Sequence, residues 1–297
     1  MATLRDWVEG ARPRTLPAAI SPVLAGTGVA WFEGHFRPLL AGLALVVALA
    51  IQVGANLAND YSDGIRGSDA IRVGPMRLVG SGAASASAVK RAALGSFAFA
   101  GVVGIVAVVL SGDWWLLAVG AACIVAAWFY TGGKHPYGYL GLGEVFVFVF
   151  FGLVAVGGTV HLQVGSLSAT AWWTAVAMGA LAVGILVANN LRDIDGDRAV
   201  GKLTLATRIG DVRTRRFFVG TIIVALAGVF AAAVTSAWWA LLGWLMVVAL
   251  AGPVTDVVKG ATGRDLIRVL KQTGFAELAC AAGMFTGLVI ASAVGRM

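Results

Sequence analysis

The sequence predicts an all-α integral membrane protein: a bundle of about nine transmembrane helices around a central cavity open to the cytoplasmic side. Hydrophobic residues make up 59% of the 297 residues and charged residues 12%, whereas a soluble domain carries about 25% charged residues. The hydrophobic residues form runs close to the roughly 20 residues that a helix needs to cross a bilayer. Such runs are too long for the strands of a membrane barrel, and helices satisfy their own backbone hydrogen bonds in lipid.

Nine apolar runs are the predicted transmembrane helices. Glu144 in the fifth run and Glu277 in the ninth are their only charged residues. Because no polar linker between them is long enough to separate two domains, we expect a single domain over residues 1–297. In chain order the runs cover residues 16–32, 39–57, 92–110, 114–130, 139–160, 169–188, 217–234, 238–254 and 275–294.

The segment before the first run is predicted to lie on the membrane surface. Leu4, Trp7, Val8 and Ala11 follow the spacing of one apolar helix face, which is typical of an interfacial amphipathic helix within residues 1–15. Prolines interrupt the first run, and many further runs follow it. We therefore interpret this run as a retained helix and not as a signal peptide.

Basic residues predict the orientation. If the N-terminus is cytoplasmic, 20 of the 22 Lys and Arg residues lie on that side, and only Arg37 and Arg296 lie outside. This is the positive-inside pattern. We therefore expect a multi-pass protein of the cell membrane with its N-terminus and active-site loops in the cytoplasm. The net charge of +7 suits anionic lipid headgroups or an anionic substrate, and nothing suggests nucleic acid.

Two acidic clusters stand at the cytoplasmic ends of the second and sixth runs. The first cluster spans residues 56–63 and the second spans residues 189–197. They are weak repeats of each other, because Asp60 and Asp193 each come four residues after an Asn of their cluster. Asn59 and Asp63 are four residues apart, as are Asp193 and Asp197, so each pair shares one helix face.

Oxygen ligands of this kind suit Mg²⁺, which takes one or two carboxylates together with water and phosphate oxygens. Arg66, Arg72 and Arg77 follow the first cluster, and Arg198 and Lys202 follow the second. These side chains could bind the remaining charge of a diphosphate. Apolar helix walls could then hold a polyprenyl tail. The alternative is a salt-bridged cytoplasmic cap without a ligand.

A third segment, residues 130–144, lies between the fourth and fifth runs on the same side. Its Gly and Pro residues break helical structure, and it contains Tyr130, Lys134, His135 and Glu144. The segment could bind substrate, or it could be a structural turn.

Together, the three segments resemble the UbiA superfamily of intramembrane prenyltransferases. Residues 59–63 match the start of the family motif NDxxDxxxD, whose final acid falls on Gly67 and could be replaced by Asp69. Asp193 and Asp197 match DxxxD, and Tyr130 with Lys134 matches YxxxK. The resemblance implies that five residues hold Mg²⁺ and diphosphate: Asn59, Asp60, Asp63, Asp193 and Asp197.

The remaining site predictions combine this resemblance with the positions of polar residues near the two clusters. Diphosphate contacts are expected from Arg72, Arg77, Lys202, Asn56 and Asn189, with Lys134 also meeting phosphate. Lys134, Tyr130 and Glu144 are candidates for deprotonating a hydroxyl group of the acceptor.

Four stretches, starting at Asn56, Gly74, Tyr130 and Asn189, resemble the members that act on 1,4-dihydroxy-2-naphthoate. This implies Mg²⁺-dependent transfer from a polyprenyl diphosphate with decarboxylation, giving demethylmenaquinone, CO₂ and diphosphate. Alternatives are another acceptor (4-hydroxybenzoate, homogentisate or a glycerol phosphate lipid) or a cation-coupled transporter. Few ionisable residues lie at mid-membrane depth, which disfavours transport.

Overall fold

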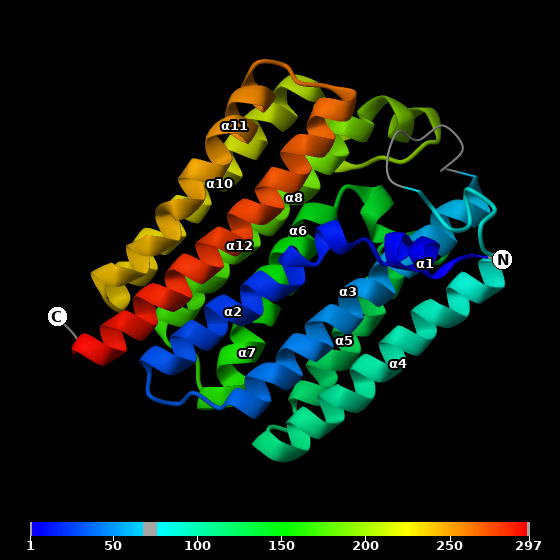
Figure 1. Cartoon of the computed structure of the whole chain (residues 1–297). Helices are drawn as coiled ribbons and strands as arrows, with labels where there is room; N and C mark the ends of the chain where they lie inside the picture. The colour runs from blue at the N-terminus through cyan, green and yellow to red at the C-terminus, as the bar shows by residue number, and fades with distance from the viewer. Residues whose placement is uncertain (1, 68–75, 296–297) are drawn as a thin grey trace.

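The computed structural model describes residues 2–67 and 76–295, and this part of the chain is helical throughout its regular structure (Figure 1). Two residues of the predicted site, Asp69 and Arg72, lie outside the described residues. Most residues of each of the nine apolar runs are helical. The all-helical membrane fold is therefore confirmed, while the number of helices that cross a membrane stays a prediction.

The first half of the chain contains α1 (Leu4–Ala11), η1 (Pro13–Thr15), α2 (Pro17–Phe32), α3 (Pro38–Arg66), α4 (Ala86–Ser111) and α5 (Leu116–Phe129). Within the described residues, α3 and α4 are long and apolar enough to span a membrane, whereas α5 is a shorter apolar helix. The segment Leu4–Thr15 meets α2 at 50°, and the position of residues 1–15 on the membrane surface stays a prediction.

The second half begins with η2 (Tyr137–Leu140), α6 (Gly143–Val147), the π-helical η3 (Phe148–Val154) and α7 (Ala155–Val164). It continues with α8 (Ala169–Ala199), α9 (Leu205–Ile209), α10 (Asp211–Thr235), η4 (Trp238–Leu245), α11 (Met246–Val258) and α12 (Gly263–Val294). Five of the seven spans found in the described residues lie here, and the fifth and eighth predicted runs each contain a change of helix type.

Helix α8 is the centre of the main hydrophobic core, where it packs against α10, α12 and η3. Small residues allow one of these contacts to be very close, because a Cβ atom added at Gly152 would lie 2.6 Å from the Cα atom of Gly179. Close approach of backbones through small residues is how helices associate in lipid, where burial of apolar surface gives little advantage. Helices α3 and α4 form a second, smaller core.

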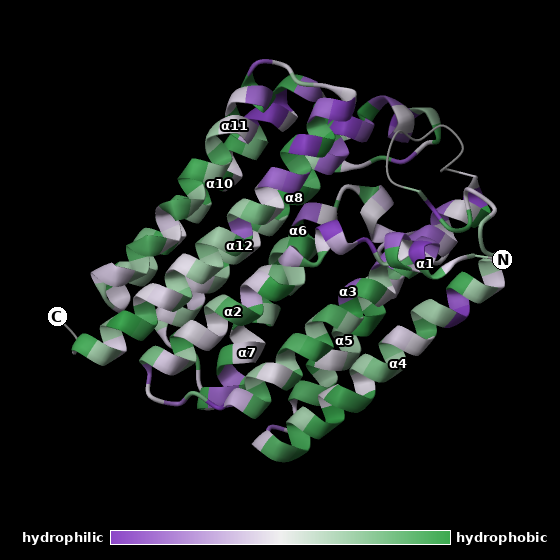
Figure 2. Cartoon of the chain, in the orientation of Figure 1, coloured by the Kyte–Doolittle hydropathy of each residue, from purple (hydrophilic) through white to green (hydrophobic). Residues whose placement is uncertain are grey.

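Polar residues collect at one end of the bundle. Figure 2 shows hydrophilic ribbon where α8 ends and along the connections near it, with mostly apolar ribbon through the middle of the bundle. Exposed tryptophans such as Trp115, Trp172 and Trp239 lie near the starts of α5, α8 and η4, at the opposite end. Charged loops at one end and tryptophans at the other are typical of a membrane protein with an interfacial aromatic belt.

Candidate active site

A cavity of about 410 Å³ opens between α3, α5, η3, α7 and α8. Its walls are mostly apolar, and polar side chains gather where α3 and α8 end. Many of the polar residues predicted from the sequence line this cavity. They are Asn56, Asn59, Asp63, Arg77, Tyr130, Asn189 and Lys202.

Other predicted site residues do not line the described cavity. Lys134 is exposed at the surface, so its predicted contact with phosphate stays a prediction. Four further residues are not among those that line the cavity: Asp60, Glu144, Asp193 and Asp197.

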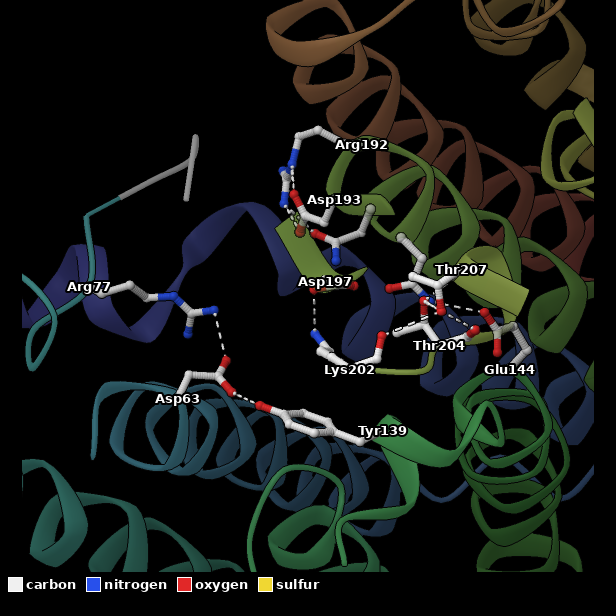
Figure 3. A network of polar contacts seen from close by, with 12 residues as sticks. Asp63, Arg77, Tyr139, Glu144, Arg192, Asp193, Asp197, Lys202, Thr204 and Thr207 are labelled. Carbon is white, nitrogen blue, oxygen red and sulfur yellow. Dashed lines mark hydrogen bonds and ion pairs between the residues drawn. The ribbon is translucent and has the colours of Figure 1, made fainter. Parts of the chain in front are cut away.

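In the first cluster, partners from two other segments of the chain fix the side chains. The hydroxyl of Thr131 donates to Asn59 Oδ1 at 2.7 Å. Asp63 Oδ1 accepts from the Tyr139 hydroxyl at 2.8 Å, and Asp63 Oδ2 lies 3.4 Å from Nη2 of Arg77 (Figure 3). Asn59 and Asp63 are therefore held on the cavity side of α3.

Asp60 has a different environment. It is fully buried, and its two carboxylate oxygens accept the backbone N–H groups of Leu78 at 2.7 Å and Val79 at 3.0 Å. These residues directly follow Arg77. Asp60 thus fastens to α3 the segment that carries Arg77 into the cavity, and its predicted role as a metal ligand stays a prediction.

The second cluster finds its partners nearby in the sequence. Arg192 forms a two-pronged pair with Asp193, with both N–O distances 2.7 Å, and also donates to Asn189 Oδ1 at 2.9 Å. Asp197 Oδ1 lies 3.3 Å from Lys202 Nζ. Bidentate arginine–carboxylate contacts fix geometry as well as charge, so Asp193 is held rigidly beside Asn189.

Tyr139 connects the two clusters. Its hydroxyl donates to Asp63 on α3, while Lys202 Nζ, beyond the end of α8, lies 5.2 Å from the centre of its ring. The guanidinium carbon of Arg66 lies 5.4 Å from the same ring. Figure 3 shows Tyr139 and Lys202 between the acids of α3 and those of α8. From the sequence, Tyr139 is one of several tyrosines of this segment that are candidates for deprotonating the acceptor, and residue spacing does not predict its contact with Asp63.

The third segment supports the cavity wall. Asn190, which lines the cavity, donates to Glu144 Oε1 at 3.0 Å. Glu144 is buried and can therefore act on a ligand in the cavity through Asn190. A tyrosine phenol is protonated at neutral pH, so Tyr130, which lines the cavity, can donate a hydrogen bond to a ligand there, and its predicted role in deprotonating the acceptor stays a prediction.

Gly67 explains the departure from the family motif. This residue ends α3 in a left-handed conformation with φ of 72°, which glycine adopts without strain and an aspartate does not. The helix that carries the first cluster therefore ends where the motif has its last acid.

The donor atoms fit Mg²⁺ shared with a phosphate ligand better than a metal bound by protein alone. In the described part of the chain, no three His, Cys, Asp or Glu side chains are grouped closely enough to hold a metal ion. The carboxylates are instead divided between α3 and α8, with Arg77 and Lys202 beside them. Mg²⁺ is typically held by one or two carboxylates plus substrate phosphate oxygens, which this arrangement can supply.

Comparison with known proteins identifies the class. The sequence profile of the UbiA prenyltransferase family matches residues 19–266. A solved structure described as a UbiA homolog from Archaeoglobus fulgidus bound to GPP and Mg²⁺ has the same fold, with a TM-score of 0.72 at 11% identity, covering 95% of this chain and 99% of that one. The chain thus belongs to the UbiA prenyltransferase family and is a membrane prenyltransferase.

Three curated relatives with higher sequence identity share one enzyme name. The chain is 50% identical to the 1,4-dihydroxy-2-naphthoate octaprenyltransferase of Mycobacterium tuberculosis, with 94% of each chain covered. It is 45% identical to the protein of that name from Mycobacterium leprae over 99% of each chain. Identity to the protein of that name from Escherichia coli is 40%, covering 82% of this chain and 80% of the relative.

Proposed function

We propose that this protein transfers a polyprenyl group from a polyprenyl diphosphate to 1,4-dihydroxy-2-naphthoate, a step of menaquinone biosynthesis. The observation that carries the proposal is the pair of oxygen-rich clusters at the polar end of an apolar cavity, joined through Tyr139 and Lys202. The names of relatives that are 40–50% identical support the acceptor.

The diphosphate is proposed to bind between α3 and α8. Asn59 and Asp63 on one side, with Asp193 and Asp197 on the other, would hold Mg²⁺, and Asn56 and Asn189 stand beside them. When bound, the metal ion neutralises diphosphate charge and stabilises the leaving group. Arg77 and Lys202, which line the cavity, add fixed positive charge where the departing diphosphate gains negative charge. Arg72 is proposed to join them from the segment outside the described residues.

The prenyl tail is proposed to lie in the apolar part of the cavity. Phe146, Phe150 and Phe151 line it on one side, and residues of α3, α4 and α5 line it on the other. These walls exclude water from the carbon that loses its diphosphate, and water would otherwise capture the allylic cation.

The chemistry balances without removal of a ring proton. The C–O bond to diphosphate breaks, and the ring carbon that bears the carboxylate forms a bond to the allylic carbon. The carboxylate then leaves as CO₂, and its bonding electrons restore the aromatic ring. Tyr130 and Asn190 face the cavity, where they can bind one ring hydroxyl, while Glu144 holds Asn190 in place.

We propose that the polar end of the cavity faces the cytoplasm. The charged diphosphate head of the substrate is soluble there. The distribution of basic residues and the tryptophans at the other end support this.

Prenyl transfer by the purified full chain in detergent tests the proposal. 1,4-Dihydroxy-2-naphthoate or 4-hydroxybenzoate is offered anaerobically with a polyprenyl diphosphate, with and without Mg²⁺. The expected result is Mg²⁺-dependent product and CO₂ from the naphthoate alone. Product from the benzoate alone would retain the diphosphate chemistry and refute the acceptor. No product from either, in folded protein, would refute both.

A further inference from the structure

The turn between α1 and α2 presents an arginine to the same cavity in a conformation that favours glycine. Arg12 has φ of 54° and is the one non-glycine residue with positive φ in the described ranges. A side chain at such a position costs conformational energy, and strained residues of this kind persist where the surrounding structure enforces them, often at functional sites. Arg12 thus occupies a backbone conformation that glycine would adopt more easily.

Two amides on α3 hold this turn in place. Asn56 Nδ2 donates to the carbonyl of Ala11 and to Thr15 Oγ1, both at 2.9 Å. Gln52 Nε2 donates to Thr15 Oγ1 at 3.1 Å, and the Thr15 hydroxyl donates to the Arg12 carbonyl at 3.0 Å. The position of Arg12 is therefore built from one face of α3.

Two polar atoms at this turn lack partners. Arg12 Nη2 and Gln52 Oε1 are both buried, and neither forms a hydrogen bond within the described part of the chain. Both residues line the cavity. Burying a charged donor or a carbonyl without a partner is unfavourable. A ligand that satisfied both atoms would carry a negative group next to a hydroxyl donor.

We propose that Arg12 and Gln52 form the acceptor subsite, in which Arg12 binds an aromatic carboxylate and Gln52 accepts a hydrogen bond from the ring hydroxyl ortho to it. This inference rests on the proposed function and specifies its acceptor class as ortho-hydroxy aromatic acids. The donor diphosphate fits the pair poorly, because the Gln52 carbonyl would face phosphate oxygens. Gln52 also precedes Asn59 by seven residues, roughly 10 Å along α3.

The subsite is expected to act on binding more than on the chemical step. The carboxylate keeps its charge while the C–O bond to diphosphate breaks, so its contact with Arg12 is the same in the ground state and in that transition state. Interactions that are equal in the ground state and the transition state change KM and leave kcat nearly constant. The alternative acceptor 4-hydroxybenzoate lacks an ortho hydroxyl and would leave Gln52 without its partner.

Equilibrium binding to the purified full chain in detergent tests the assignment of Arg12. The probes are 1-hydroxy-2-naphthoate and 1-naphthol, which lacks the carboxylate. Arg12→Gly removes the guanidinium and relieves the left-handed backbone, so the variant is expected to fold. It should weaken binding of the hydroxynaphthoate at least tenfold and leave 1-naphthol binding within about twofold. Arg12→Lys should restore part of the affinity, and Arg14→Gln, at an exposed position of the same turn, should change neither.

A second ligand pair tests Gln52. The wild-type chain is expected to prefer 1-hydroxy-2-naphthoate over 2-naphthoate, and Gln52→Leu should abolish that preference. Because the comparison is made between two ligands on the same variant, a general loosening of the turn does not affect it.

Two other outcomes would overturn the inference, and a third would overturn only the proposed function. If Arg12→Gly weakened the binding of both probes equally, the turn would have only a structural role. If Arg12→Gly raised KM for the polyprenyl diphosphate and left naphthoate binding unchanged, Arg12 would bind phosphate and not the acceptor. Wild-type protein that binds the hydroxynaphthoate through Arg12 yet transfers no prenyl group to the dihydroxynaphthoate would refute the proposed function and leave the acid-binding subsite standing.

Discussion

The two acidic clusters have similar sequences and different structural support. In the α3 cluster, Asn59 and Asp63 depend on Thr131, Tyr139 and Arg77, which lie at least 14 residues away in the sequence. In the α8 cluster, Asp193 pairs with the adjacent Arg192, and Asp197 pairs with Lys202, five residues further on. One cluster is assembled by the tertiary structure, and the other is held by its own segment.

The positions of the two helices account for this difference. In an apolar 18-residue window of each helix, 72% of the window is buried inside the protein for α8, compared with 22% for α3. Packing on many sides orients α8, so local ion pairs are sufficient to fix its acids. Helix α3 borders the cavity, and the loops that cross its end provide the missing contacts. We therefore expect the α3 cluster to respond to distant substitutions and the α8 cluster to respond mainly to local ones.

The largest expected effect comes from Asp63→Asn. The change removes a proposed metal ligand and the partner of both Tyr139 and Arg77, so kcat/KM for prenyl transfer should fall roughly 1000-fold, or about 4 kcal/mol of transition-state stabilisation. Asp195→Asn is the matched control, because the side chain of Asp195 is fully exposed. Comparable losses in the two variants would show that neither acid has a specific role.

The next effect is expected from Lys202→Ala, which tests the α8 side of the site. Without this cation, KM for the polyprenyl diphosphate should rise and kcat should fall, together lowering kcat/KM roughly 100-fold. Lys202→Arg should retain part of the activity. Arg198→Ala removes an exposed cation of the same segment, and a decrease as large as that of Lys202→Ala would contradict a specific contact with phosphate.

Tyr139→Phe breaks the connection between the clusters while it keeps the ring beside Lys202. A hydrogen bond to a charged group contributes about 1.5–3 kcal/mol, so kcat should fall roughly tenfold or more, with a shift in the Mg²⁺ dependence. Tyr137→Phe is the control, since the Tyr137 hydroxyl donates to the carbonyl of Ala126 and not to an acid. Normal kcat for Tyr139→Phe would show that the α3 cluster does not need this contact.

The smallest effect on catalysis is expected from Asp60→Asn. An amide has one acceptor oxygen, so one of the N–H groups of Leu78 and Val79 would lose its partner, destabilising the fold by about 1–3 kcal/mol. Thermal unfolding should shift downward, while the Mg²⁺ concentration for half-maximal activity should stay constant. An increase in that concentration would instead support the ligand role that the family resemblance implies for Asp60.

Hydropathy and residue spacing determined most of the fold class, because lipid allows few ways to satisfy the backbone. The nine runs became helical segments, and both acidic clusters lie at helix ends as predicted. Local patterns do not report a change of helix type, so the π-helical turn of residues 148–154 and the short α5 came from the structure. The apolar run of residues 139–160 gives no sign of the π-helix, and the run of residues 114–130 gives no sign that its helix is short.

The sequence by itself identified the chemistry of this protein: two groups of Asn and Asp, basic residues near them and apolar walls for a lipid. Only the tertiary structure decided which of those residues meet. It placed Tyr139 between Asp63 and Lys202, gave Asp60 two backbone amides and brought Arg12 to the cavity beside Gln52. The physical reason is that residue type and spacing follow from the chain alone, whereas contacts between segments tens of residues apart depend on how the helices pack.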